Sequence, residues 1–434
     1  MFALLKKIAR QPLVRVSSLT SISTGVRFIT AFITTKVAAI LIGPAGVALV
    51  GQLQNFSSIV MAIATGGINI GVTKYVAEYK NSKNKVRVFI STALKINLAL
   101  SILVGILMIF LSSIISENLF HSNEYQIVII IFGFTVILYS LNTLLLSILN
   151  GFKEFKKYVM INIVASITGL IFSVGFIYLL GILGALISVV TYQSVVVFVT
   201  IIMLTKTEWF NLDYFLFGFS KFALKKYLGF TLMVLVSAFS VPVASIIIRN
   251  YITVNLSLND AGIWEGVNQV SGIFLMFLSS TLMTYYIPRL SELKEKKDLR
   301  HEIIKTAKLV LPVAFFSCLT IFLLRDIVIK IVFSPLFYSM RDLFIFQMIG
   351  LFFKVSSFLI ATLMHAKAKT KEFVITEILF SALNVTFSIL FMNTFGLIGI
   401  TIAYALNSFL YLSTMIIIFR DIIFYREKLL ITNK

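Results

Sequence analysis

The feature that most constrains this chain is a succession of long apolar runs separated by short polar breaks. A helix needs about 20 apolar residues to cross the hydrocarbon of a bilayer. Of the 434 residues, 59% are hydrophobic and 13% are charged, whereas a soluble domain has about 25% charged residues. The pattern predicts an all-α polytopic membrane protein with twelve spans, at about 17–42, 47–72, 88–115, 127–149, 159–180, 184–205, 228–250, 263–287, 306–324, 343–365, 374–393 and 398–419.

The basic residues predict how these spans are oriented. Both terminal segments and the loops after the even-numbered spans hold 30 of the 38 Lys and Arg residues, and the opposite side keeps Arg249, Arg325, Lys330 and Arg341. Because Lys and Arg gather in cytoplasmic loops, both termini are expected in the cytosol. This bias and attraction to anionic lipid account for the net charge of +20, so we expect no nucleic-acid partner.

The chain is expected to have two lobes of six spans each. The first residues form a short basic segment without a small-residue cleavage site, which predicts an uncleaved cytosolic arm or an interfacial helix. The predicted segments are an arm at 1–16, a first lobe at 17–206, a cytosolic linker at 207–227, a second lobe at 228–419 and a cytosolic tail at 420–434.

An internal repeat supports the two lobes. Four short matches recur at nearly one offset and at equivalent topological positions: Ala45-Gly46 with Ala261-Gly262, Lys74 with Arg289, Lys153-Glu154-Phe155 with Lys371-Glu372-Phe373, and Gly181-Ile-Leu-Gly184 with Gly396-Leu-Ile-Gly399. At the first of these offsets Gln52 meets Asn268, so a polar residue recurs at one depth. An even number of spans per half predicts parallel lobes related by a pseudo-two-fold axis along the membrane normal, with substrate between them.

Four basic residues fall inside predicted spans, namely Arg27, Lys36, Lys95 and Lys354. Each costs about 2.5 to 3.5 kcal/mol at the bilayer centre on insertion scales, so something must offset that cost. One interpretation is that they face a wet internal cavity and bind an anion. The alternative is that each long side chain snorkels to a headgroup layer.

The position of each residue in its span decides which of the two interpretations is favoured for it. Lys354 lies near the middle of its span, where snorkelling is hardest, whereas Lys36 and Lys95 lie closer to span ends. Arg249 lies at the end of span seven. It either faces the cavity or anchors the span at the outer interface. Arg27 and Lys36 are nine residues apart, about 180° around an ideal helix. A straight helix cannot turn both toward one cavity, and we expect Arg27 to face inward.

Other polar features are few. Among the acids, Glu265 and Glu377 alone approach lipid depth, so the predicted interior is net cationic. Pro242 lies inside span seven. Proline kinks a helix, and this kink is either a hinge or a static feature of packing. The three His residues and the single Cys318 show neither metal-ligand nor catalytic spacing. We therefore expect no catalytic residue, metal or cofactor.

Several segments resemble the Wzx-type flippases of lipid-linked oligosaccharides, and above all those of enterobacterial common antigen and O-antigen. The resemblance covers essentially the whole chain and extends to a superfamily that includes multidrug exporters of the MATE type. The segments that carry it are GPAGVALVGQLQNFSSIVMAIATGGINIGVTKYVAEYK at 43–80, FTLMVLVSAFSVPVASIIIR at 230–249, AGIWEGVNQVSG at 261–272, RDLFIFQMIGLFFK at 341–354 and AKAKTKEF at 366–373.

The resemblance implies a flippase of the bacterial inner membrane. Its substrate would be an undecaprenyl-pyrophosphate-linked repeat unit, which a single chain moves from the cytosolic to the periplasmic leaflet by alternating access through a cationic cavity. Partners would be membrane lipids and the polymerase and chain-length regulator of the same pathway. The implied substrate-binding residues are Arg27, Lys36, Arg249 and Lys354, with Lys74, Lys95, Gln52, Asn268 and Glu265 as secondary candidates. Glu265 departs from the pattern, because an uncharged amide is expected there.

Three other functions stay open at this point. A MATE-type antiporter of cationic drugs shares the expected architecture but needs acids inside the lobes. A membrane polysaccharide polymerase needs a large periplasmic loop, and the predicted external loops are short. A non-transporting scaffold would give the intramembrane charges no purpose. Neither the sugar of the repeat unit nor a coupling ion can be identified from these residues.

Overall fold

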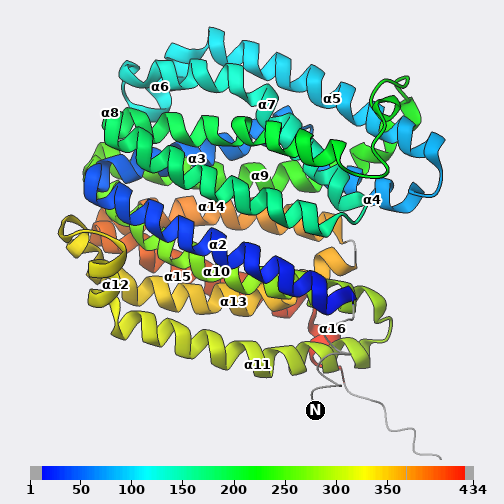
Figure 1. Cartoon of the computed structure of the whole chain (residues 1–434). Coiled ribbons are helices and arrows are strands. Elements are labelled where there is room, and N and C mark those ends of the chain that lie inside the picture. Colours follow the sequence, from blue (N-terminus) through cyan, green and yellow to red (C-terminus); the bar gives the residue numbers. More distant parts are fainter. Residues whose placement is uncertain (1–11, 368, 426–434) are drawn as a thin grey trace, which may run out of the picture. The chain divides into compact units, whose positions relative to one another are not determined.

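The computed structural model describes residues 12–367 and 369–425 and is helical, with no strand in these ranges (Figure 1). The chain divides into two compact units, with the boundary between Thr253 and Val254. The predicted arm at 1–16 lies outside the described residues except for 12–16, which belong to the first helix. Residues 426–434 of the predicted tail also lie outside them.

Unit 1 contains the longer series of helices, and α9 extends two residues past its boundary. The elements are α2 (Pro12–Leu41), α3 (Gly43–Ala64), α4 (Asn69–Tyr79), α5 (Lys83–Phe110), α6 (Ser112–Phe120), η1 (Asn123–Tyr125), α7 (Gln126–Gly151), α8 (Phe155–Thr205), η2 (Leu212–Tyr214) and α9 (Lys221–Asn255).

Unit 2 begins after Thr253 and holds the remaining helices. These are α10 (Leu258–Glu292), α11 (Lys296–Leu323), α12 (Arg325–Val332), η3 (Pro335–Leu343), α13 (Phe344–Ala366), α14 (Thr370–Phe395), α15 (Leu397–Ile418) and α16 (Arg420–Ile423).

Ten helices of the described residues are long and apolar enough to cross a membrane. One of them, α8, has 51 residues, or about 76 Å at 1.5 Å per residue, which is more than twice the hydrocarbon thickness. Gly181 has non-helical φ and ψ and divides α8 where the sequence predicts the turn between spans five and six. The count of twelve spans remains a prediction.

The second predicted span is shorter than expected. Its apolar run was expected to continue to residue 72, but α3 ends at Ala64 and α4 begins at Asn69. Gly66 and Gly67 both have positive φ, at 62° and 63°, which side chains with a Cβ rarely adopt. Two successive residues in this conformation break the helix, and Lys74 lies on the separate short helix α4.

Two glycine pairs give the predicted repeat the same local geometry in both units. Gly181 has φ 57° and ψ −130°, and Gly396 has φ 62° and ψ −147°. A Cβ on Gly184 would lie 1.9 Å from the carbonyl oxygen of Phe176, eight residues earlier. A Cβ on Gly399 would lie 2.1 Å from the carbonyl oxygen of Phe391, also eight residues earlier. The two halves of the chain therefore turn in the same way between consecutive spans.

Unit 1 is held together by close helix packing. In unit 1, α7 packs against α5 and α8, and α2 packs against α8 (Figure 1). A Cβ on Gly105 would lie 2.5 Å from the carbonyl oxygen of Gly133, so α5 and α7 cross with their backbones nearly touching. Small residues at helix crossings allow such dispersion contacts in a membrane.

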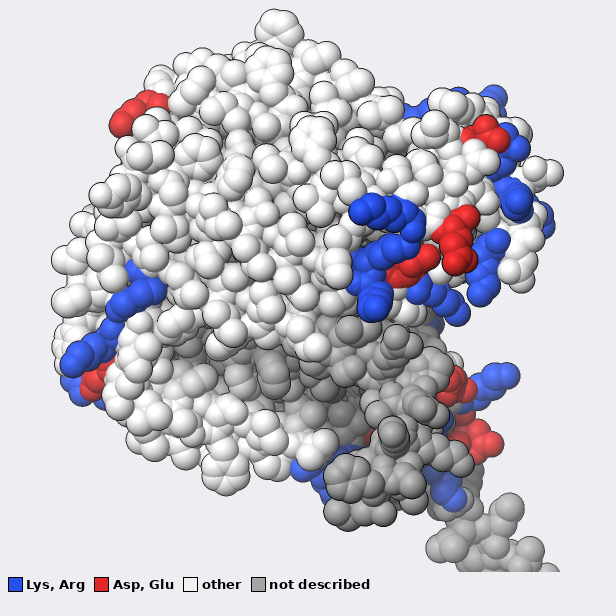
Figure 2. All heavy atoms as spheres, in the orientation of Figure 1, with Lys and Arg blue, Asp and Glu red and all other residues white. Residues whose placement is uncertain are grey.

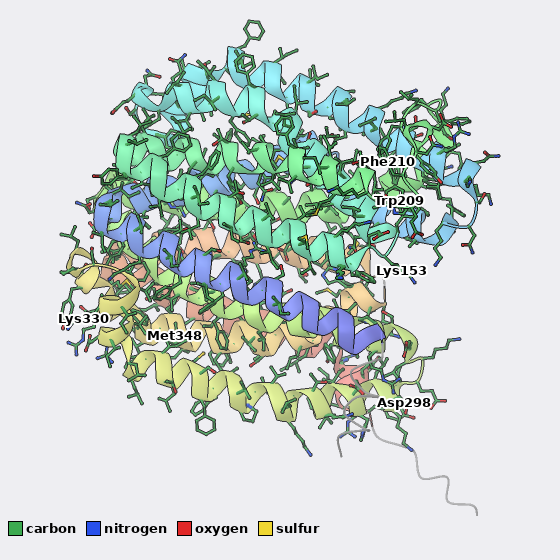
Figure 3. All side chains as sticks on the ribbon, in the orientation of Figure 1. Lys153, Trp209, Phe210, Asp298, Lys330 and Met348 are labelled. Carbon is green, nitrogen blue, oxygen red and sulfur yellow. The ribbon has the colours of Figure 1, made fainter. Side chains whose placement is uncertain are left out.

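The segment between α8 and α9 packs onto one end of unit 1. The rings of Trp209 and Phe152 stack with centroids 3.8 Å apart, and Lys153 lies at the same end (Figure 3). In α9, the Tyr227 hydroxyl donates to the carbonyl oxygen of Phe89, at 2.9 Å. The start of α9 is therefore part of unit 1. The lobe limits at 206 and 228 describe the expected topology and remain predictions.

On the face shown, Lys, Arg, Asp and Glu side chains gather toward the two sides of the view, and the described surface between them is mostly uncharged (Figure 2). In unit 2, Asp298 near the start of α11 and Lys330 on α12 lie at opposite ends (Figure 3). The sequence also places these two residues on opposite sides of the membrane, as expected for a single crossing by α11.

Candidate functional site

The first two candidate residues lie on α2 and face in different directions. Residues 22–41 of this helix carry both Arg27 and Lys36, and no break interrupts them. Nine residues of continuous helix turn the two side chains about 180° apart. Arg27 is exposed and Lys36 is half-buried within unit 1. The alternative of a distorted first span is therefore not needed.

The charge of Arg27 reaches a phenol of unit 1 that is near a set of hydrogen-bonded amides in the sequence. Its charge interacts with the phenol of Tyr139 on α7, which also interacts with Tyr192 on α8. Nearby in sequence, the Asn142 amide donates to Gln193 Oε1 at 3.1 Å, and the Thr200 hydroxyl donates to Asn142 Oδ1 at 2.6 Å. Phenols and amides near a guanidinium suit a ligand that carries both an anion and hydroxyl groups.

The structure brings together Arg249 and Gln52, which the sequence analysis named as separate candidates. Arg249 is 3% exposed, and its Nη1 donates to Gln52 Oε1 at 2.7 Å. Gln52 in turn donates through Nε2 to Asn250 Oδ1 at 2.6 Å, and Asn250 donates to the carbonyl oxygen of Asn118 at 3.4 Å. The end of α9 is thus fastened to α3 and to the end of α6 by a chain of hydrogen bonds.

Replacing Gln52 by alanine is expected to destabilise the protein. The change removes the oxygen that accepts from the buried Arg249, and a hydrogen bond to a charged group contributes about 1.5 to 3 kcal/mol. Thermal unfolding in detergent should therefore show a lower Tm for Gln52→Ala. Gln54→Ala, two residues further on α3 at an exposed position, is the matched control and should unfold like the parent. Equal Tm values for the two variants would contradict the role of Gln52.

The secondary basic residues of unit 1 lie on α4 and α5. Lys74 is exposed on α4, with its Nζ 5.2 Å from the ring centroid of Tyr75. Lys95 on α5 donates from Nζ to the carbonyl oxygen of Phe217, at 3.0 Å. This agrees with snorkelling of Lys95 toward the predicted cytosolic linker. Pro242 lies inside α9, and its role as a hinge remains a prediction.

In unit 2, Lys354 lies within a cluster drawn from three helices. Its Nζ on α13 is 5.0 Å from the ring centroid of Tyr411 on α15. Glu377 on α14 is close enough for its charge to interact with that of Lys354. The sequence was interpreted as leaving the intramembrane bases unbalanced by acids. In unit 2, packing of α14 on α15 and α13 brings Glu377, one of the two acids expected near lipid depth, within range of the charge on Lys354.

The other candidates of unit 2 lie on α10. Asn268 Oδ1 accepts from Gln347 Nε2 at 3.2 Å, and the same amide group donates to Ser271 Oγ at 2.9 Å. Gln347 is 1% exposed, and Glu265, one turn before Asn268, is 8% exposed. Gln52 and Asn268, which the repeat aligns, therefore each join a buried amide network inside their own unit.

Sequence reasoning missed several polar residues of these clusters. They are uncharged, and the sequence analysis selected residues by the free-energy cost of a charge at lipid depth. The residues concerned are Tyr139, Asn142, Gln193 and Gln347. A signal was present, because uncharged polar side chains recur on α7 at about one-turn spacing: Thr135, Tyr139, Asn142 and Thr143. The aromatic ring of Tyr411 gave no signal, since aromatic residues are common throughout the chain.

Comparison with known proteins gives a family and close relatives. Residues 13–294 match the family model described as polysaccharide biosynthesis protein. The lipid III flippases of Escherichia coli (strain K12) and Shigella flexneri are each 30% identical to this chain over 401 residues. Those alignments cover 92% of this chain and 96% of each flippase.

Solved structures of similar fold are transporters. A multidrug resistance MATE family transporter of the MOP superfamily, in an inward-facing conformation, matches with a TM-score of 0.72 and 16% identity over 92% of this chain and 94% of that one. A MOP superfamily transporter from Pyrococcus furiosus Vc1 (DSM3638) matches with a TM-score of 0.72 and 15% identity over 95% of each chain. These matches show a MATE-like fold.

Proposed function

The chain belongs to the family of polysaccharide biosynthesis proteins, and we propose from this premise that it is a flippase of a lipid-linked oligosaccharide. The resemblance to Wzx-type flippases is thereby confirmed. The observation that carries the proposal is the 30% identity to lipid III flippases across 92% of the chain. The protein is a multi-pass membrane protein with a transporter fold, and we assign it transport rather than catalysis.

The finer substrate proposal is an undecaprenyl-pyrophosphate-linked repeat unit, moved from the cytosolic to the periplasmic leaflet of the bacterial inner membrane. The strong bias of Lys and Arg to one predicted side supports cytosolic termini. Both the O-antigen and the enterobacterial common antigen type of repeat unit fit this description. A single chain suffices, and a polymerase and a chain-length regulator of the same pathway are the protein partners that we propose.

The pyrophosphate is the part of the substrate whose passage through the membrane is most costly without the protein. It carries about two negative charges, and an unpaired ion is extremely costly in hydrocarbon. We propose that Arg27 of unit 1 and Lys354 of unit 2 each act as a counterion to it during transport, and that Lys36 and Arg249 act in the outward half of the pathway. The guanidinium can bind phosphate in a fork, whereas lysine acts as a point charge. Arg27 is exposed within its unit, which leaves it accessible to such a ligand.

The sugars would bind beside Arg27, where its charge reaches the phenol of Tyr139. Tyr139 interacts with Arg27 and Tyr192, and Gln193 accepts from Asn142. Sugar hydroxyls both donate and accept hydrogen bonds, as phenols and amides do. This arrangement supports a binding region for the glycan next to that for the phosphate.

Movement across the membrane would follow the alternating-access scheme that suits this fold. Solved MATE family transporters of the same fold are described in inward-facing and outward-facing conformations. A membrane potential that is negative inside favours outward movement of an anion by about 2.3 kcal/mol per charge per 100 mV. A MATE-type exporter of cations remains the alternative, but the likeness to those transporters is at 16% identity and concerns the fold.

Depletion of the protein in its own cells tests the proposed function. Lipid-linked repeat units should accumulate where a sugar-specific lectin reaches them only after the inner membrane of spheroplasts is permeabilised. Depletion of the polymerase is the control, because it should leave unpolymerised units accessible from the periplasm. A normal distribution of repeat units, with a gain in sensitivity to cationic drugs, would instead favour the exporter.

A further inference from the structure

Unit 1 contains an apolar groove of about 810 Å³ between α3, α5 and α9. This volume lies within the range of small-molecule sites, about 300 to 1,000 Å³. Lys95 and Thr231 are the polar side chains among its lining residues. Thr231 donates to the carbonyl oxygen of Gly66 at 3.0 Å, so its hydroxyl is satisfied. The groove therefore presents almost nothing but hydrocarbon to a ligand.

The groove is long and follows one face of α9. Residues of α9 that line it recur at spacings of three and four, and run from Leu224 to Phe239. Fifteen residues of helix extend about 22 Å, which is more than the roughly 15 Å of hydrocarbon in one leaflet. Ala99 on α5 is a small, exposed lining residue on the opposite wall. Such a shape suits an extended hydrocarbon chain better than a compact ligand.

A positive charge stands at the end of the groove that the α8–α9 segment crosses. Lys95 and Phe219 line this end, and Lys95 donates one of its three N–H bonds to the Phe217 carbonyl oxygen. The segment is fixed there, because Ser91 also donates to Phe217 and the backbone N–H of Ser220 donates to Thr92 at 3.1 Å. Lys95 is thus held in place with donors left for an anion.

One neighbouring charge of this end, that of Arg87, is already paired. Arg87, two turns before Lys95 on α5, lies 3.8 Å from the Asp213 carboxylate and its guanidinium lies over the Phe217 ring at 5.2 Å. Arg87 also donates to the backbone carbonyl oxygen of Asp213, at 3.4 Å. Lys95 is the charged side chain among the residues that line the groove.

We propose that this groove binds part of the isoprenoid chain of the lipid-linked substrate, with Lys95 beside the phosphate end of that chain. The proposal rests on the proposed function. A single chain that ends in an anion matches an apolar groove whose lining includes one cation, Lys95. A zwitterionic phospholipid has two chains, and its ammonium group would be repelled by Lys95. The groove would hold the chain while the head group enters the pathway.

Photo-crosslinking of the purified full-length protein tests this assignment. The probe is a sugar-free polyprenyl diphosphate that carries a benzophenone within its chain, with uncharged polyprenol and a diazirine phosphatidylglycerol as comparison probes. The diphosphate probe is expected to label peptides of α5 and α9. Ala99→Trp, which fills the groove, should lose this labelling. Leu103→Trp, one turn further on α5 at an exposed position outside the lining, should keep it.

Lys95→Gln provides a second variant that keeps the groove open. It should weaken labelling by the diphosphate probe by about tenfold, the effect of one charge-assisted contact, and leave labelling by polyprenol unchanged. Equal labelling of Ala99→Trp and Leu103→Trp would overturn the proposal, as would complete displacement of the probe by equimolar phosphatidylglycerol. If the probe labels the groove but depletion of the protein leaves the repeat units correctly distributed, the proposed function is refuted and the groove assignment stands.

Discussion

Replacing Lys354 by alanine is expected to abolish most flipping while the protein still folds. A hydrogen bond or ion contact to a charged group contributes about 1.5 to 3 kcal/mol, so its loss from the transport step corresponds to roughly 10- to 150-fold in rate. Display of the finished glycan at the cell surface, in cells whose sole copy is the variant, measures this. Lys354→Arg keeps the charge and should retain measurable transport. Lys308→Ala, an exposed lysine of α11 in the same unit, should transport normally.

A double variant separates substrate binding from a purely structural role. In Lys354→Ala, Glu377 loses the basic residue whose charge interacts with its own, and that loss alone could damage unit 2. Glu377→Gln removes the stranded charge. If Lys354 serves only to neutralise Glu377, Lys354→Ala with Glu377→Gln will recover transport. If Lys354 binds the pyrophosphate, the double variant will fold well and still fail to transport, which is the result we expect.

Alanine at Gly184 or Gly399 is expected to disrupt folding of the corresponding unit. The added Cβ would lie 1.9 Å or 2.1 Å from a backbone carbonyl oxygen, closer than real contacts allow, and the backbone of consecutive spans must separate. Overpacking of this kind costs typically about 1 to 3 kcal/mol and occasionally more. Both variants should show lower yield and a lower Tm in detergent, by similar amounts because the geometry recurs in both units.

Gly175→Ala is the matched control for this pair. Gly175 lies in α8, and a Cβ there would meet nothing within 4 Å. Alanine is about 0.8 to 1.0 kcal/mol better than glycine inside a helix, so Gly175→Ala should leave the Tm unchanged or raise it. A Tm for Gly184→Ala as high as that of Gly175→Ala would show that the close approach of backbone is not required.

Much of the fold follows from local sequence signals. Apolar runs of span length predict the helices because hydrocarbon requires every backbone group to be satisfied within the helix. The matched glycines at 181 and 396 predict where consecutive spans turn, and both adopt backbone conformations with positive φ. The break in the second span was missed. Gly66 and Gly67 stand inside an otherwise apolar run, and glycine is tolerated within membrane helices.

The candidate site was predictable in its charges but not in its partners. Arg27 and Lys354 stand out because a base at lipid depth is costly. Their neighbours come from other helices: Tyr139 from α7, and Glu377 and Tyr411 from α14 and α15. Such contacts depend on how helices rotate against each other, and one sequence does not specify that. The bond between Gln52 and Arg249 joins residues 197 apart in the chain for the same reason.

The central claim is that this chain moves a lipid-linked oligosaccharide across a bilayer, and reconstitution tests it most directly. The purified protein is placed in liposomes that contain the undecaprenyl-pyrophosphate-linked repeat unit, and a glycosidase added outside measures the exposed fraction over time. With units loaded only in the inner leaflet, the account predicts that protein-containing liposomes expose them and protein-free liposomes do not. Equal exposure in both, with the protein correctly folded and a membrane potential applied, would contradict it.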